Sequence, residues 1–275
     1  MSKTICFVGA GNMARSLIGG LLSDGRDPST IWVSDTSAET LHALGEQFRV
    51  NTGTDNAEVC ARAAAVVLAV KPQVLRSVAH SLASTVQEQK PIVISIAAGV
   101  RAPDLEIWLG GNVPIVRAMP NTPALVGSGA TGLFANSRTS ADQRQLAESI
   151  LRAAGVTVWV HEEPLLDVVT ALSGSGPAYF LLVMQALEQA GGALGLEPAA
   201  ARLLTLQTAF GAAKMALESS ESPAELRARV TSPGGTTERG VSVLQDGRFE
   251  ALLKDAVTAA RQRAQELGDV LGEQS

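Results

Sequence analysis

The chain has 275 residues, of which 46% are hydrophobic and 18% charged, with 26 glycines and few aromatic residues. Its formal net charge of −5 argues against a protein that binds the phosphate backbone of nucleic acids. Two cysteines, Cys6 and Cys60, exclude a disulfide scaffold and a four-cysteine zinc site. No set of His, Cys and Asp residues has metal-ligand spacing, so we expect no metal site. From the net negative charge we expect no nucleic-acid partner.

The lengths of the apolar segments indicate the cellular location of the protein. The apolar run after Lys3 is too short for the hydrophobic region of a signal peptide, and Gly9 interrupts it. No uninterrupted apolar stretch reaches the ~18 residues that span a bilayer. We therefore expect a soluble, cytoplasmic protein that has no membrane partner.

The amino-terminal half alternates short β-branched runs with amphipathic helical patterns. Apolar strands separated by helices are typical of a parallel sheet that is covered on both faces. We expect a Rossmann-like, doubly wound, mostly parallel α/β domain over residues 1–162. Its predicted strands are Thr4–Val8, Thr30–Val33, Ala65–Val70, Pro91–Ile96, Pro114–Arg117 and Val156–Val160, and its predicted helices are Met13–Ser23, Ser37–Phe48, Asp55–Ala64 and Gln73–Gln87.

From Glu163 onward the strand signal stops, and an all-α domain is expected over residues 163–275. Its helical stretches are unusually apolar, and Leu203–Leu217 has Lys214 as its only charged residue. Because a helix that is apolar most of the way round must be buried on several sides, we expect an interface between subunits. A compact monomeric bundle with a central helix is the alternative. The predicted helices are Leu165–Leu194, Pro198–Glu218, Pro223–Val230 and Phe249–Leu271.

A glycine-rich turn follows the first predicted strand. Gly9-Ala10-Gly11-Asn12-Met13-Ala14 has the pattern G-x-G-x-x-A and opens a helix. The glycines permit a tight turn and close approach of a pyrophosphate, and the helix start supplies free amides. Asp35, at the end of the second strand, would accept hydrogen bonds from an adenosine ribose and repel a 2′-phosphate. These residues predict a dinucleotide site and favour NADH over NADPH, although Thr36 and Ser37 could still bind a phosphate.

Later strand ends carry further candidates for this site. Lys71 follows an apolar strand and precedes Pro72, which suits the first position of a helix. The ligand edge of an open α/β sheet lies at these strand ends, although Lys71 could also simply solvate the strand. Two more strand ends carry Ala97-Ala98-Gly99 and Met119-Pro120-Asn121-Thr122-Pro123, and the two prolines restrain the second segment.

Two loops of the helical half combine glycine, proline and hydroxyl residues. Leu172–Tyr179 interrupts an apolar helical pattern, which indicates either close backbone packing or a binding site. In Val230–Glu238, Ser232 is a suitable N-cap and Pro233 a suitable first helical residue, so a helix is predicted from there toward Gln245. The amides of Gly234, Gly235, Thr236 and Thr237 would then be free to bind a carboxylate, although an ordinary capped helix start is the alternative.

The residues that are missing restrict the chemistry. The three histidines, His42, His80 and His161, lie on polar helix faces or at the domain boundary. A dehydrogenase that oxidises an alcohol needs a base, whereas these loops offer Ser and Thr. This composition suits reduction of a C=N bond that is already protonated or easily protonated.

Six motifs along the whole chain resemble those of the pyrroline-5-carboxylate reductases: G-A-G-N-M-A at Gly9–Ala14, A-V-K-P at Ala69–Pro72, A-A-G at Ala97–Gly99, M-P-N-T-P at Met119–Pro123, L-S-G-S-G-P-A-Y at Leu172–Tyr179 and V-T-S-P-G-G-T-T at Val230–Thr237. The resemblance implies reduction of the cyclic imino acid 1-pyrroline-5-carboxylate to L-proline by NADPH or NADH. It also implies a homodimer, often assembled into decamers, with each active site between one subunit's cofactor domain and its partner's helical domain.

The resemblance also implies roles for individual residues. Thr237 would hydrogen-bond the ring nitrogen, and Ser232 is the second candidate catalytic residue. A β-hydroxyacid dehydrogenase, whose catalytic helix supplies a Lys where this chain has Tyr179-Phe180-Leu181, and a non-catalytic nucleotide-binding regulator are the alternatives. The expected substrate contacts are Val230, Ser232, Gly234, Gly235, Thr236, Thr237, Ser175 and Gly176, and the expected cofactor contacts are Gly9, Ala10, Gly11, Asn12, Met13, Ala14, Asp35, Asn56, Ala69, Val70, Lys71, Pro72, Ala97, Ala98, Gly99, Met119, Pro120 and Asn121.

Overall fold

The computed structural model describes residues 3–273. They form two compact units, one made of the residues up to Ser175 together with those from Ala259 onward, and the other of Gly176–Thr258. Residues 163–175 and 259–273 thus belong to the first unit, so the boundary between the compact units differs from the predicted domain boundary between residues 162 and 163.

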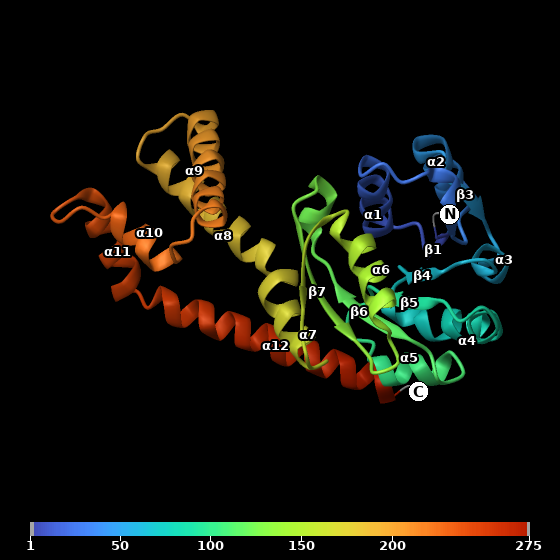
Figure 1. Cartoon of the computed structure of the whole chain (residues 1–275). Helices are drawn as coiled ribbons and strands as arrows, with labels where there is room; N and C mark the ends of the chain where they lie inside the picture. Colours follow the sequence, from blue (N-terminus) through green and yellow to red (C-terminus); the bar gives the residue numbers. More distant parts are fainter. Residues whose placement is uncertain (1–2, 274–275) are drawn as a thin grey trace. The chain divides into compact units, whose positions relative to one another are not determined.

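The first unit is built on an eight-stranded sheet in the order β3-β2-β1-β4-β5-β6-β7-β8 (Figure 1). Every neighbouring pair of strands is parallel except β6 and β7. The predicted doubly wound, mostly parallel sheet is therefore confirmed. The strands are β1 (Ile5–Val8), β2 (Ile31–Ser34), β3 (Asn51–Gly53), β4 (Ala65–Leu68), β5 (Ile92–Ser95), β6 (Ile115–Met119), β7 (Gly129–Ala135) and β8 (Gly155–Trp159).

Helices cover both faces of this sheet. Because successive residues of a strand point to opposite faces, Ile5 and Phe7 enter one core and Cys6 and Val8 enter the other. One face carries α1 (Asn12–Ser23), α2 (Ala38–Phe48) and α6 (Ala141–Arg152), and the other carries α3 (Asn56–Cys60), α4 (Pro72–Gln89) and α5 (Ala102–Trp108).

The strands β3 and β7 and the α-helices α5 and α6 of the first unit were not predicted from the sequence. Two glycines make β7 a poor strand by composition. The structure explains both of them, since a Cβ on Gly132 would lie 2.6 Å from a methyl group of Val169 and a Cβ on Gly129 would lie 2.7 Å from the Ala154 carbonyl oxygen. For α6 a usable signal was present, because Ser140 and Gln143 form a capping box at its start.

A buried ion pair joins β6 to the segment that follows the sheet. Arg117, whose side chain is 9% exposed, donates to the Oε1 atom of Glu163 at 2.7 Å. Nearby, in α7 (Leu165–Val169), burial raises the pKa of Asp167, and the attraction of Arg117 and other arginines only partly offsets this effect. Asp167 is therefore held in a setting that disfavours its charge.

Substituting Asp167 by asparagine is expected to raise the melting temperature at neutral pH. Because the pKa of Asp167 is higher in the folded than in the unfolded state, its contribution to stability falls as pH rises through that interval. The advantage of Asp167→Asn should therefore shrink toward acidic pH, as thermal unfolding across a pH series can show. Asp27→Asn is the opposite control, since the Ser29 amide lowers the pKa of Asp27 and its charge stabilises the fold at neutral pH. Equal effects of both variants at every pH would contradict this assignment.

The predicted helical stretch Leu165–Leu194 is helical over Leu165–Ala193, but it is not one regular α-helix, because π-helical residues Thr170–Gly174 separate α7 from α8 (Gly176–Ala193). Such π segments often mark functional sites. The wide turn is closed by the Ser175 amide, which donates to the Thr170 carbonyl at 2.8 Å.

The second unit is helical throughout its regular structure, as predicted. Helix α8 packs on α9 (Pro198–Glu218), and both expose large apolar side chains, with Phe180 69% and Leu203 67% exposed. The segment Leu165–Ala193 is long and apolar enough to cross a membrane, by length and composition only. The unit continues through α10 (Pro223–Arg229), α11 (Thr236–Asp246) and the first part of α12 (Phe249–Glu273).

Candidate active site

The predicted glycine turn lies where β1, β2 and β4 end side by side. The Gly9 amide donates to the Ser34 carbonyl at 2.7 Å, and the Ala69 amide donates to the Val8 carbonyl at 2.8 Å. Gly9 has φ +104°, and a Cβ there would lie 2.6 Å from the Ala69 carbonyl oxygen. Glycine is therefore required at position 9 by its backbone conformation and by the neighbouring strand end.

The helix that follows this turn presents an open amino terminus. Gly11 is the N-cap of α1, and a Cβ on it would meet nothing within 4 Å. Among the described residues, the Asn12 and Met13 amides have no hydrogen-bond partner. The small side chain of Ala14 is fully buried and lets the helix pack closely on the sheet. Free amides at the positive end of a helix, with open space before them, fit the pyrophosphate of a dinucleotide.

Asp35 contacts the glycine turn directly. Its Oδ2 atom accepts a hydrogen bond from the Ala10 amide at 2.8 Å, and its Oδ1 atom accepts one from the Ser37 amide at 2.9 Å. A carboxylate has about four lone-pair sites, so acceptor capacity remains for a ribose hydroxyl. Sequence reasoning predicted the ribose contact but missed the role of Asp35 in holding the glycine turn.

Asn56 begins α3 beside a hollow of about 440 Å³. The Asp55 carboxylate caps this helix by accepting from the Ala57 and Glu58 amides at 2.8 and 3.1 Å. The lining residues are Thr54, Asp55, Asn56, Ala57 and Ser81, so the structure has space beside Asn56, which is a predicted cofactor contact.

The other predicted strand-end residues lie at the same edge of the sheet. Lys71 is the exposed N-cap of α4 and Pro72 its first residue, as the sequence predicted. Ala69 and Val70 come directly after β4. In the segment after β5, Ala97 is buried whereas Ala98 is exposed.

The structure brings Met119-Pro120-Asn121 against the π-helical segment. The Asn121 Nδ2 atom donates to the Ser173 carbonyl at 3.0 Å, and its Oδ1 atom accepts from the Ala130 amide at 2.8 Å. A Cβ on Gly174 would lie 2.9 Å from the Cε atom of Met119. Gly174 therefore packs directly against the Met119 side chain, and the Asn121 side chain, predicted only as a cofactor contact, ties these segments together.

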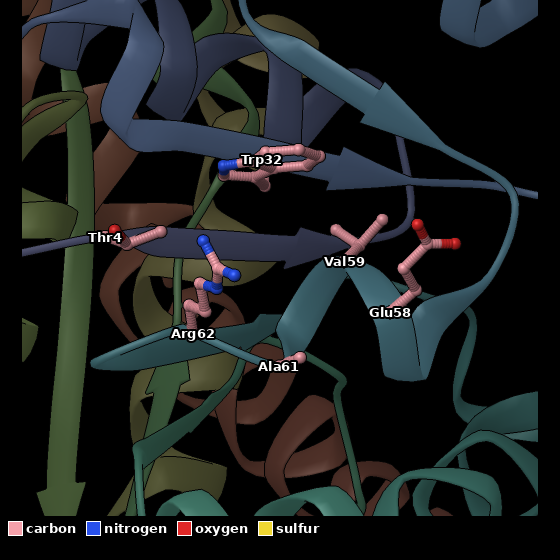
Figure 2. Close-up of a pocket in the computed structure, with 6 residues that line it drawn as sticks. All are labelled: Thr4, Trp32, Glu58, Val59, Ala61 and Arg62. Atoms are coloured by element: carbon pink, nitrogen blue, oxygen red, sulfur yellow. The ribbon is translucent and has the colours of Figure 1, made fainter.

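A separate hollow of about 500 Å³ lies away from this edge, near the amino end of β1 (Figure 2). Figure 2 shows Trp32 on one side of it and Val59 and Arg62 on the other. None of the predicted site residues lines it; the lining residues are Thr4, Trp32, Glu58, Val59, Ala61 and Arg62.

In the second unit, the helix start predicted at Ser232 and Pro233 is wrong. Helix α11 begins at Thr236, with Gly235 as its N-cap. The preceding residues form a turn in which the Gly235 amide donates to the Ser232 carbonyl at 3.0 Å and Gly234 has φ +70°. The chain can enter this left-handed conformation because Gly234 has no Cβ, so the turn replaces the predicted first helical turn.

Two of the four amides predicted to be free are therefore occupied. Besides the Gly235 amide, the Gly234 amide donates to the Glu238 Oε2 atom at 2.7 Å. The Thr236 and Thr237 amides have no partner among residues 3–273, and both side chains are exposed in the single chain. What remains is a helix start with two free amides and two hydroxyls, beside the Glu238 carboxylate, and its free amides can hold a small carboxylate.

Comparison with known proteins places these features in a family. Residues 163–267 match the model described as pyrroline-5-carboxylate reductase dimerisation, and residues 4–99 match NADP oxidoreductase coenzyme F420-dependent. A pyrroline-5-carboxylate reductase from Pseudomonas aeruginosa is 50% identical over 98% of both chains.

Solved structures agree with this match. A pyrroline-5-carboxylate reductase from Coxiella burnetii is 49% identical and superposes with a TM-score of 0.95 over 97% of this chain and 99% of its own. A Plasmodium falciparum pyrroline carboxylate reductase with NADP bound is 28% identical, with a TM-score of 0.84 over 97% and 98% of the two chains. With near full-length identity of this level, the chain belongs to the pyrroline-5-carboxylate reductase family.

Proposed function

We propose that this protein reduces 1-pyrroline-5-carboxylate to L-proline, with the carboxylate of the substrate bound at the start of α11. The observation that carries the proposal is the pair of free amides at Thr236 and Thr237, beside the Thr237 hydroxyl, within the segment that matches the family's dimerisation model. An anion at a helix amino terminus is stabilised by the free N–H groups and by the helix dipole.

The first unit would hold the cofactor along its strand ends. The Asn12 and Met13 amides would take the pyrophosphate, Asp35 the adenosine ribose, and the residues after β4, β5 and β6 the nicotinamide. NAD(P)H supplies the hydride for the C=N carbon. The residues of the protein then have to hold this carbon beside the nicotinamide and keep one proton on the ring nitrogen.

The residues before α11 would place the substrate. Thr236 and Thr237 hold the carboxylate through their amides, and the Thr237 hydroxyl contacts the ring nitrogen. Ser232 keeps the turn in place through its carbonyl, which leaves its hydroxyl available to the substrate. Since a threonine hydroxyl does not ionise near neutral pH, Thr237 orients an iminium or relays a proton from water.

The activity is tested by following loss of reduced nicotinamide absorbance when 1-pyrroline-5-carboxylate is added to the purified protein. Rapid loss with this imine supports the proposal, and proline should appear in the same proportion. A six-membered cyclic imine in a parallel assay reports ring-size selectivity. Binding of the cofactor without turnover would instead favour a regulator, and turnover of a β-hydroxyacid alone would favour the dehydrogenase alternative.

The complete site is proposed to combine the cofactor unit of one subunit with residues 230–237 of its partner. Mixing two inactive variants tests this, one with Gly9→Val in the cofactor turn and the other with Thr237→Ala. In a mixed dimer with shared sites, one site has both defects and the other has none, so activity returns. If each site lies within one chain, every site keeps a defect and mixing restores nothing.

The exposed apolar face of α8 and α9 is proposed to be covered by a second copy of the chain, without a membrane or nucleic-acid partner, in the cytoplasm. Phe180→Glu should therefore dissociate the protein and abolish activity, because burying a charge in an apolar interface is strongly unfavourable. Val126→Glu in the first unit, where Val126 is 78% exposed, is the control. Light scattering measures the mass and separates a dimer from a decamer. An unchanged mass for Phe180→Glu, or capture of the wild type by lipid vesicles, would contradict this proposal.

A further inference from the structure

The end of α12 packs against the segment that follows β5 with almost no space between the two backbones. A Cβ on Gly268 would lie 3.2 Å from the carbonyl oxygen of Gly99. In the other direction, a Cβ on Gly99, which has φ +81°, would lie 3.0 Å from the Cδ1 atom of Leu271 and 3.6 Å from the Gly268 amide nitrogen. Glycines at positions 99 and 268 thus allow a contact that any side chain would widen.

Polar contacts hold the same segment where it leads into α5. The Ala102 amide donates to the Glu163 Oε1 atom at 2.7 Å, the same atom that accepts from Arg117. Arg101 forms an ion pair with Asp269 of α12 at 2.5 Å. The segment between β5 and α5 is therefore supported by α12 and by the Glu163–Arg117 pair.

We infer that the end of α12 is a positioning element for the nicotinamide-binding segment Ala97–Gly99, and that it acts through Gly268. This inference rests on the proposed function, which places the nicotinamide at Ala97–Gly99. Ala98 is exposed, whereas Gly99 contacts α12. Because close-packed backbones transmit small displacements, moving α12 outward moves the segment on which the nicotinamide would lie.

Gly268→Ala tests the inference, since its Cβ would press on a backbone carbonyl that cannot rotate away. The expected result is weaker cofactor binding, measured by fluorescence titration of reduced nicotinamide, and a kcat/KM for the cofactor that is about tenfold lower. This loss is smaller than the roughly 10²-fold loss for a 1 Å misplacement, because a Cβ at 3.2 Å displaces its neighbour by only a few tenths of an ångström. The KM for the imine and the melting temperature should stay unchanged. Gly272→Ala is the matched control, because its Cβ would meet only the flexible Asp104 carboxylate, at 3.3 Å.

A third variant separates failure of this inference from failure of the proposed site. Ala98→Asp adds a charge on the exposed side of the segment and should weaken cofactor binding if the nicotinamide lies there. Unchanged binding for Ala98→Asp would reject the proposed cofactor contact itself. If Ala98→Asp weakens binding while Gly268→Ala behaves like Gly272→Ala, the positioning role is rejected. A Gly268→Ala variant that raises both KM values and lowers the melting temperature together would show only a structural role.

Discussion

Replacing Thr237 by alanine is expected to lower kcat by about 10²–10⁴-fold, the usual contribution of a group that handles a proton in the transition state. Thr237 is the second residue of α11, so its backbone amide stays available to the substrate carboxylate in the variant. The KM for the imine should therefore change much less than kcat. Steady-state kinetics with saturating cofactor measure both constants.

Two matched variants make this result interpretable. Thr237→Ser retains the hydroxyl and should keep most of the activity, whereas Thr237→Val keeps the shape and should behave like alanine. Thr236→Ala, one residue earlier and also exposed, tests whether any hydroxyl at this helix start is sufficient. If kcat falls by well under tenfold in Thr237→Ala, Thr237 has only a packing role.

The second large effect is expected at Asp35, which should make the wild-type enzyme favour NADH over NADPH. Its carboxylate accepts hydrogen bonds from the Ala10 and Ser37 amides, and its negative charge would repel the 2′-phosphate of NADPH bound beside it. Asp35→Asn removes the charge but retains one acceptor oxygen. Because hydrogen bonds to charged groups contribute about 1.5–3 kcal/mol, the ratio of kcat/KM for NADPH to that for NADH should rise by about 10- to 100-fold.

Glu197→Gln is the control for this prediction. Glu197 also accepts from two backbone amides, but it caps α9 in the second unit instead of bridging to the glycine turn. Its substitution should leave the cofactor ratio unchanged. A wild-type enzyme that strongly prefers NADPH, or an Asp35→Asn variant with an unchanged ratio, would show that this carboxylate does not select the cofactor.

The apolar strands and the glycine turn were predictable because their signals are local. A run such as Ala65–Leu68 is buried on both faces and has no polar alternation, and Pro72 marks the first residue of α4 by its fixed φ. Elements with weak local signals were missed. In β7 the glycines exist because Val169 and Ala154 approach the strand, and neither residue is near it in sequence.

The start of α11 shows where the local argument failed. Ser232 followed by Pro233 is a good helix-start signal, yet the helix begins at Thr236 because Gly234 adopts a left-handed conformation and Glu238 takes its amide. Sequence preference for a cap is worth only about 1 kcal/mol, so a turn with compensating hydrogen bonds can replace it. Two of the four amides predicted to be free thus remain free, and the anion site itself stays a prediction.

The amino-acid sequence alone determined the mostly parallel sheet, the helical second part and the glycine turn after the first strand, because hydrophobic period, glycine turns and helix starts act over a few neighbouring positions. Only the tertiary structure decided that Asp35 holds the glycine turn, that the Asn121 side chain bonds to the π-helical segment, and that Gly99 meets Gly268. These contacts join residues far apart along the chain, and their energies depend on atomic distances that no local pattern encodes.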